Sequence, residues 1–130
     1  MDQAGGIILL IDDNKIDIEV NTKLLQKSNC ADQVIAYTSA VAGLHFLHTC
    51  AQHTKIPDLI LLDIYMPEMD GFQFLEQYQH CPEDVVNGCT VVMISSSRDE
   101  LDLNRAHAHP LVQKAITKPL NPAQVQAFLG

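Results

Sequence analysis

The sequence predicts an α/β protein with a doubly wound, five-stranded parallel sheet and helices on both faces. Two observations support this fold class. Short apolar runs alternate along the chain with amphipathic segments, which is the pattern of repeated βαβ units. The runs are apolar throughout, as expected of strands that a parallel sheet buries on both faces. A chain of 130 residues has the length of one domain, and we expect residues 1–130 to form a single domain.

Five strands are predicted from the apolar runs. The clearest run has four consecutive apolar residues ahead of Asp63 and is bounded by Pro57 and Pro67. Its length suits a strand better than a helix. The last of the five runs is the weakest. In chain order, the predicted strands are Ile7–Ile11, Val34–Tyr37, Leu59–Leu62, Val91–Ile94 and Leu111–Thr117.

Two helices are predicted between the first three strands. The first covers about residues 15–28, and one of its faces is mostly apolar, so we expect this face to pack on the sheet. That face consists of Ile16, Val20, Leu24 and Lys27. The second helix follows Ser39, whose hydroxyl suits an N-cap, and it runs to about Ala51.

A third helix is predicted after the Asp63 strand. Asp70 can cap it, and it extends through Tyr78 with an apolar face that includes Phe74 and Leu75. The segment that follows, residues 80–90, is predicted to be the only long loop of the chain.

The last two helices are predicted from their N-terminal signals. Ser97 and Glu100 fit a capping box, which places the start of the fourth helix near Arg98. Asn121 and Pro122 put a capping residue before a proline at the first helical position. The final helix has barely two turns, and its apolar face is formed by Val125, Phe128 and Leu129.

Polar side chains stand at the ends of four predicted strands. Because parallel strands place their carboxyl ends at one edge, where open α/β sheets bind ligands, we expect these side chains to converge there. A single acid at such a position is as readily a turn residue or a helix cap. The recurrence at four strand ends favours a functional site instead. The residues are Asp12, Asp13, Asp63, Ser95 and Lys118.

The residue types at this edge indicate metal and phosphoryl chemistry. Carboxylates held together repel one another unless a cation lies among them, and Mg²⁺ prefers such hard oxygen ligands. The backbone carbonyl of Tyr65 is a further candidate ligand. Lys118 adds a positive charge and Ser95 a hydroxyl donor, so the group can stabilise a phosphoryl group in transfer. Asp63 would then act as the nucleophile and form an aspartyl phosphate.

Simpler interpretations of some of these residues stay open. Lys118 has the alternative of an exposed lysine at a strand end. The serines that follow the fourth strand also suit helix capping, which is the preferred interpretation of Ser97. Tyr65 either shields the phosphoryl group from water or is an ordinary surface aromatic, and the sequence favours neither.

Composition excludes several other classes. The net charge of -8, without a basic cluster, argues against nucleic-acid binding. No apolar stretch approaches the roughly 20 residues of a membrane span, and no basic residue precedes the first strand as in a secretory signal. The four cysteines lack CxxC spacing, so we expect neither a zinc site nor a disulfide framework, but reduced thiols in the cytoplasm. They are Cys30, Cys50, Cys81 and Cys89.

These motifs resemble those of a response-regulator receiver domain of two-component phosphorelay signalling. The resemblance covers essentially the whole chain in the right order, and four motifs at consecutive strand ends make it strong. The matching residues are Asp12-Asp13, Asp63 with the following residues through Gly71, Ser95, and Lys118-Pro119.

The resemblance implies a fold and a set of roles. The fold is flavodoxin-like, with strand order 2-1-3-4-5. Asp63 resembles the phosphoacceptor. Lys118 resembles the lysine that pairs with the phosphoryl group, and Ser95 the hydroxyl residue that follows it. The implied Mg²⁺ ligands are Asp13 and Asp63 directly, Asp12 directly or through water, and the carbonyl of Tyr65.

One position departs from the resemblance. Receivers usually carry Tyr or Phe three residues before the lysine, and its inward turn reports phosphorylation. Here this position is Ala115, and no aromatic residue occurs between Tyr78 and Phe128. We therefore expect movement of Ser95 and the loop before the fourth helix to carry the signal.

The leading hypothesis is a stand-alone receiver that a histidine kinase or phosphotransfer protein phosphorylates on Asp63. Phosphorylation would change its affinity for an effector protein, since no DNA-binding or catalytic output domain is expected. It would catalyse only its own phosphorylation and dephosphorylation. One alternative is an Mg²⁺-dependent phosphohydrolase with an aspartyl nucleophile, disfavoured because Tyr65 stands where its second Asp is usual. The other is a binding module that is never phosphorylated, disfavoured because every expected acid is present.

Overall fold

The computed structural model describes residues 6–29, 31–53, 55–95 and 100–129. In this part of the chain, five strands alternate with six helices. Among the described residues, no helix is both long and apolar enough to cross a membrane. The elements are β1 (Ile7–Ile11), α1 (Lys15–Lys27), β2 (Gln33–Tyr37), α2 (Ala40–His53), β3 (Leu59–Asp63), α3 (Gly71–Tyr78), α4 (Glu83–Gly88), β4 (Thr90–Ser95), α5 (Glu100–Ala108), β5 (Val112–Thr117) and α6 (Pro122–Leu129).

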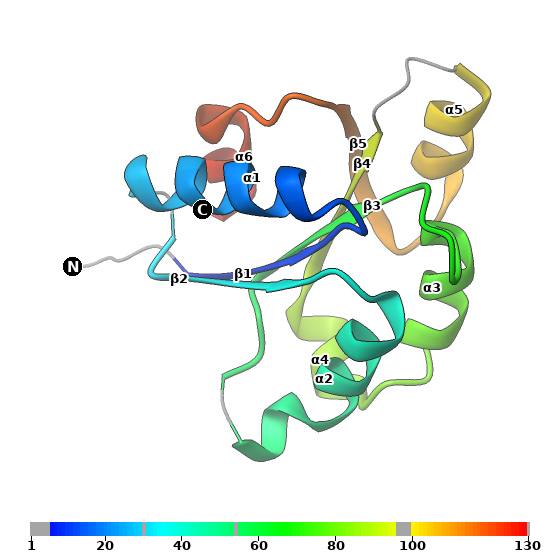
Figure 1. Ribbon diagram of the computed structural model, residues 1–130. Coiled ribbons are helices and arrows are strands. Elements are labelled where there is room, and N and C mark those ends of the chain that lie inside the picture. The colour runs from blue at the N-terminus through cyan, green and yellow to red at the C-terminus, as the bar shows by residue number, and fades with distance from the viewer. Residues whose placement is uncertain (1–5, 30, 54, 96–99, 130) are drawn as a thin grey trace.

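The strands form one parallel sheet in the order β2-β1-β3-β4-β5, which confirms the predicted fold class and order (Figure 1). The register brings the strand ends into step. Ile11 of β1 lies opposite Leu62 of β3, so Asp12 and Asp63 follow at adjacent positions of the carboxyl edge. Ser95 ends β4 at the same edge. The polar side chains predicted to converge therefore lie at the carboxyl edge of the sheet.

Helices cover both faces of the sheet, as predicted (Figure 1). α1 and α6 lie on one face, where Leu25 and Val125 are fully buried against the sheet. α2, α3, α4 and α5 lie on the other face, where the larger core is built around residues such as Phe74 and Tyr78. β1 and β3 are buried along their whole length, as the apolar runs predicted. Burial on both sides fixes these two strands and the acids at their ends.

Three of the predicted N-caps are present. The hydroxyl of Ser39 accepts a hydrogen bond from the backbone N–H of Ala42 at 3.2 Å. Asp70 and Gln73 form a reciprocal capping box at the start of α3. The side-chain oxygen of Asn121 accepts a backbone N–H two residues further on at 2.9 Å. The predicted capping box at Ser97 lies outside the described residues, and the described part of α5 begins at Glu100.

The predicted sheet-facing side of α1 is wrong except for Leu24, which is partly buried against the core. Ile16 and Val20 are 73% and 57% exposed, whereas Asn21 and Leu25 are buried. The buried pair lies four residues apart, with Ile18 partly buried against the same core. A polar Asn in this stripe hides it from a hydrophobicity pattern, while Ile16 and Val20 imitate an inward face. Helix α1 is thus rotated relative to the expectation.

The prediction of a long loop over residues 80–90 is also wrong, because α4 occupies most of it. This helix has 6 residues, which is too short to show a helical period in the sequence. Pro82 precedes it, and Glu83 and Asp84 stand in its first turn, where carboxylates favour a helix N-terminus. Val85 is fully buried and holds the turn against the core.

Gly71 at the start of α3 packs directly against the backbone of the Asp63 strand. Its N–H donates to the carbonyl of Ile64 at 2.7 Å. A Cβ at this position would lie 2.9 Å from the Asp63 carbonyl oxygen and 2.4 Å from Cε of Met93. The methionine end can move, but the β3 backbone cannot do so without displacing Asp63. This close approach explains why the chain has glycine here.

We expect Gly71→Ala to lower the free energy of unfolding by about 1–3 kcal/mol, the usual cost of overpacking. Urea denaturation with a fluorescence or circular-dichroism readout measures it. Gly88→Ala is the matched control, because its Cβ would meet nothing closer than Cγ2 of Ile56 at 3.4 Å. Equal stabilities of the two variants would contradict the packing argument.

Candidate functional site

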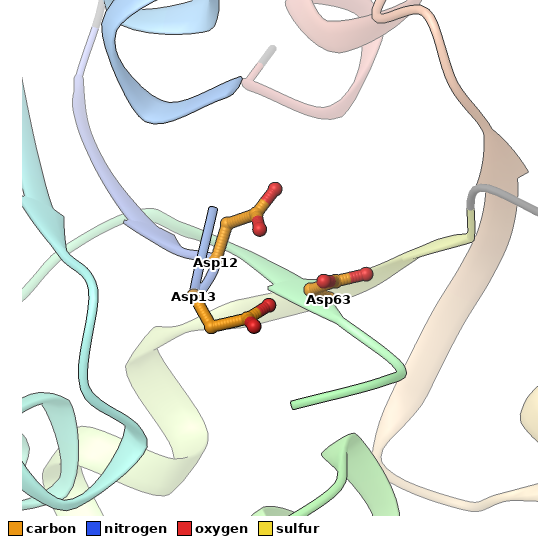
Figure 2. Close-up of side chains that lie close together, drawn as sticks. All are labelled: Asp12, Asp13 and Asp63. Atoms are coloured by element: carbon orange, nitrogen blue, oxygen red, sulfur yellow. The ribbon is translucent and has the colours of Figure 1, made fainter. Parts of the chain in front are cut away.

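Three carboxylates meet at the carboxyl edge of the sheet. Asp12 and Asp13 directly follow β1, and Asp63 is the last residue of β3. One carboxylate oxygen from each residue lies within 4.8 Å of the others, and Figure 2 shows the three side chains gathered at these strand ends. Asp12 is fully buried, Asp63 is 5% exposed, and Asp13 is exposed. The structure therefore brings the predicted acid cluster together, with one open side.

The backbone of the β1 end holds Asp12 in place. Its N–H donates to the carbonyl of Tyr37 on β2 at 3.2 Å. Its Oδ1 accepts the backbone N–H of Asn14 at 3.0 Å. Asn14 in turn caps α1, because its side-chain oxygen accepts the N–H groups of Ile16 and Asp17. The turn from β1 into α1 thus fixes both the buried acid and the first turn of the helix.

The environment makes Asp63 difficult to ionise on its own. Burial raises the pKa of Asp63 from its ordinary value, and the neighbouring Asp12 charge raises it further, to about 7. Lys118 partly offsets this, and Asp13 adds a smaller upward contribution. The cluster therefore has more negative charge than its surroundings neutralise. Carboxylate oxygens in such a cluster fit a hard divalent cation, which would favour the ionised form.

Lys118 lies at the same edge but contacts Asp12 instead of Asp63. Its Nζ is 2.8 Å from Oδ2 of Asp12 and 2.8 Å from Oδ2 of Asp17. Burial alone would lower the pKa of Lys118, but hydrogen bonds to the two carboxylates raise it well above its usual range. The ammonium is therefore charged at any physiological pH. The predicted lysine is therefore at the site, where the acids at the end of β1 and the start of α1 hold it.

Ser95 is fully buried at the end of β4. Its backbone carbonyl accepts the N–H of Lys118 at 2.8 Å, which ties the ends of β4 and β5 together. The structure thus places Ser95 and Lys118 on neighbouring strand ends, beside the strand that ends in Asp63. The individual roles assigned to these residues stay predictions.

Asp17 is a residue of this edge that the sequence analysis missed. It stands in the first turn of α1, not at a strand end, so a search along strand ends passes over it. A signal was nevertheless available. A helix that begins directly after an edge acid places its first-turn side chains over the same edge, and Asp17 is an acid in that turn. Its pairing with a lysine 101 residues away was not visible in the sequence.

Tyr65, two residues past Asp63, contacts helix α5. Its side chain is 52% exposed, and its hydroxyl donates a hydrogen bond to Oδ2 of Asp102. This hydrogen bond joins the loop after Asp63 to α5, the helix that connects β4 to β5. Its carbonyl as a cation ligand stays a prediction.

Ala115 occupies the position at which the resemblance implied an aromatic switch. It lies on β5 opposite Met93 and is 6% exposed, so its small side chain is part of the core. In place of an aromatic residue on β5, the hydrogen bond between Tyr65 and Asp102 connects the site to α5.

We expect Tyr65→Phe to increase amide hydrogen exchange in α5 by up to about tenfold, because one exposed hydrogen bond contributes about 0.5–1.5 kcal/mol. Exchange measured by mass spectrometry on peptides covering residues 100–108 tests this. Tyr37→Phe is the control and should leave exchange in α5 unchanged. The Tyr37 ring packs against Phe46, and Tyr37 lies on β2, the outer strand farthest from β5. Unchanged protection of α5 in Tyr65→Phe would show that the contact does not hold the helix.

Fold and site together define a doubly wound α/β domain with a cluster of carboxylates at the carboxyl edge of its sheet. The chain belongs to the response regulator receiver domain family, whose profile matches residues 8–129. It is 28% identical over 99 residues to the response regulator Rcp1 of Synechocystis, an alignment covering 75% of the chain and 66% of Rcp1. It spans smaller shares of other curated relatives, which include a hybrid histidine kinase.

Solved structures share the whole fold. A response regulator receiver protein from Dyadobacter fermentans superposes with a TM-score of 0.86 at 34% identity, covering 96% of this chain and 95% of that one. The phosphorylated cyanobacterial phytochrome response regulator RcpA gives 0.75 at 27% identity over 97% and 89% of the two chains. The Mn²⁺-bound form of Rcp1 gives 0.71 at 25% identity over 95% and 88%. The chain is therefore a two-component receiver domain by sequence and by fold.

Proposed function

We propose that this receiver domain is a signalling switch that accepts a phosphoryl group on Asp63 from a histidine kinase or phosphotransfer protein. The observation that carries the proposal is the placement of Asp63. It is a nearly buried carboxylate at the end of a rigid strand, with two further carboxylates and a charged lysine at the same edge. The solved structures of a phosphorylated and of an Mn²⁺-bound relative support the same chemistry.

The donor in this proposal is a phosphohistidine. An oxygen of the Asp63 carboxylate attacks phosphorus, an O–P bond forms and the N–P bond breaks. The imidazole nitrogen keeps the electron pair and takes up a proton from water. The acid must be ionised to attack, which its raised pKa opposes. The burial of Asp63 limits access of water to the product.

The cation in this proposal is Mg²⁺, held by Asp12, Asp13, Asp63 and the carbonyl of Tyr65. The donor set supports it, because three carboxylate oxygens within 4.8 Å of one another are the hard ligands that Mg²⁺ takes. Bound there, Mg²⁺ would supply the positive charge that favours ionised Asp63 and the phosphoryl oxygens. The carboxylates position it, and Asp13 leaves the cluster open to solvent on one side.

Lys118 and Ser95 would act on the phosphoryl group after transfer. The ammonium of Lys118 is 2.8 Å from Asp12, and an oxygen of Asp12 lies within 4.8 Å of one of Asp63, so a movement of the lysine side chain would bring it to a phosphoryl group on Asp63. Ser95 ends the strand between Asp63 and Lys118, and we assign its hydroxyl as a donor to a phosphoryl oxygen. Movement of these two groups would alter the surface formed by the β4 end and α5.

We further propose that the output is a change of affinity for an effector protein, and that the domain works in the cytoplasm. The net charge of -8 disfavours nucleic acid as the direct partner. Cys50, Cys81 and Cys89 are free thiols in the described structure, as suits a reducing compartment. The domain would catalyse only its own phosphorylation and dephosphorylation.

Incubation with acetyl phosphate and Mg²⁺, followed by intact mass spectrometry, tests the proposal. We expect one phosphoryl adduct per chain, absent in Asp63→Asn and absent after EDTA treatment. Continuous release of phosphate over many turnovers without an adduct would identify a phosphohydrolase instead. The absence of both adduct and turnover in a folded, Mg²⁺-loaded protein would identify a binding module that is never phosphorylated.

A further inference from the structure

We propose that Asp17 is a positioning residue that holds Lys118 away from Asp63 and thereby restrains phosphorylation. The inference rests on the proposed function. Lys118 Nζ lies 2.8 Å from Oδ2 of Asp17 and 2.8 Å from Oδ2 of Asp12. Among the described residues, these are its two ion pairs, and neither involves the proposed acceptor. The ammonium must therefore move before it can bond a phosphoryl group on Asp63.

The position of Asp17 follows from the start of α1. Asn14 caps the helix and accepts the N–H of Asp17 at 3.1 Å, which fixes the first turn over the end of β1. The positive end of a helix also attracts a carboxylate in this turn, so the helix favours Asp17 at this place with or without the lysine. Its location is therefore set by the helix and not by the ion pair. Lys118 is the partner that moves, because its side chain is longer than that of Asp17.

The two carboxylates that hold Lys118 differ in accessibility. Asp12 is fully buried and belongs to the acid cluster, whereas the Asp17 side chain is 37% exposed. A cation among Asp12, Asp13 and Asp63 would share the charge of Asp12 and weaken its hold on the ammonium. Asp17 stands outside that cluster, so its hold remains. Under these conditions Asp17 competes with the phosphoryl oxygens for the same N–H donors.

This competition predicts the direction of the effect. An ion pair with one partly exposed member is a weak restraint, which a phosphoryl group can displace. We expect Asp17→Asn to raise the rate constant of phosphorylation by acetyl phosphate about fivefold. The affinity for beryllofluoride, a phosphoryl mimic that binds without group transfer, should rise by a similar factor. Asp17→Glu, which keeps the charge, should stay close to wild type.

Two controls separate this role from a general charge or structural effect. Glu19→Gln removes one negative charge from the same helix, but Glu19 pairs with the exposed Lys23 at 3.3 Å and should not affect either measurement. Adding Asp17→Asn to Lys118→Met should leave beryllofluoride affinity unchanged, because the restrained group is gone. An equal gain in Glu19→Gln, or a gain without Lys118, would overturn the proposal.

The experiment also separates this inference from the proposed function. If wild type forms the Asp63-dependent adduct and binds beryllofluoride but Asp17→Asn behaves identically or more weakly, only the role of Asp17 fails. If wild type forms no adduct and binds no beryllofluoride with Mg²⁺ present, the proposed function fails and the inference with it. A gain in Asp17→Asn that depends on Lys118 supports both.

Discussion

Replacing Lys118 with methionine is expected to lower the free energy of unfolding by about 2–4 kcal/mol in metal-free protein near pH 7.5. The side chain of Lys118 is 16% exposed and its main partner, Asp12, is fully buried. Methionine would leave the Asp12 carboxylate without its ion-pair partner, next to Asp63 and Asp13. Removing one partner of a buried pair is costly because the other charge stays desolvated.

Urea denaturation in EDTA measures this loss, and Lys23→Met is the matched control. Lys23 pairs with Glu19, but both side chains are more than two-thirds exposed. Exposed pairs of this kind contribute little, so Lys23→Met should change the stability by less than about 0.5 kcal/mol. A similar loss in the two variants would contradict the electrostatic account of the site.

Replacing Asp63 with asparagine should have the opposite effect and stabilise the metal-free protein by about 2–4 kcal/mol at pH 8. The pKa of Asp63 is raised from 3.8 to about 7, chiefly by burial and next by the charge of Asp12. A carboxyl whose pKa is raised by folding favours the folded state at low pH. That contribution is lost as the pH rises from about 4 to about 7, because the folded state must then ionise a buried group.

The pH dependence identifies the cause of this stabilisation. Wild type and Asp63→Asn should have nearly equal stability at pH 4 and diverge through the range from pH 4 to 7. Saturating Mg²⁺ at pH 8 should stabilise wild type more than the variant, because the variant lacks one ligand charge. A difference in stability that is constant from pH 4 to 8 would show that the ionisation of Asp63 is not responsible.

The strand framework could be predicted from the sequence because its signal is local. Runs such as Leu59–Leu62 are apolar throughout, and the structure buries them on both faces. The acids that end these runs are placed by the strands, so the convergence of Asp12 and Asp63 followed from parallel pairing alone. Caps such as Asp70 were also predictable, since capping depends on residues only three positions apart.

Other features depend on tertiary packing, which a single sequence does not show. The face of α1 that packs on the sheet was predicted wrongly, because Asn21 is buried while Ile16 and Val20 are exposed. α4 was missed because it is shorter than two helical turns. The pairing of Lys118 with Asp17 depends on which helix lies over the end of β1, and this is a property of the assembled fold.

The division of roles between strands and helices accounts for the proposed switch. The acids lie at the ends of β1 and β3, which are buried along their length and cannot move easily. The groups that would respond to a phosphoryl group are not part of a buried strand. They are the long side chain of Lys118 and the loop residue Tyr65, which is hydrogen-bonded to α5. In the proposed switch, a rigid acceptor with movable neighbours would convert one covalent change into a change of the surface.

Locating the modified residue shows whether Asp63 carries the phosphoryl group. Protein phosphorylated by acetyl phosphate and Mg²⁺ is treated with borohydride, which reduces an acyl phosphate to an alcohol, and its peptides are then sequenced by tandem mass spectrometry. We expect Asp63 alone to be converted, and nothing to be converted when acetyl phosphate is omitted. Conversion of Asp12 or Asp13 in place of Asp63 would show that Asp63 is not the phosphoacceptor.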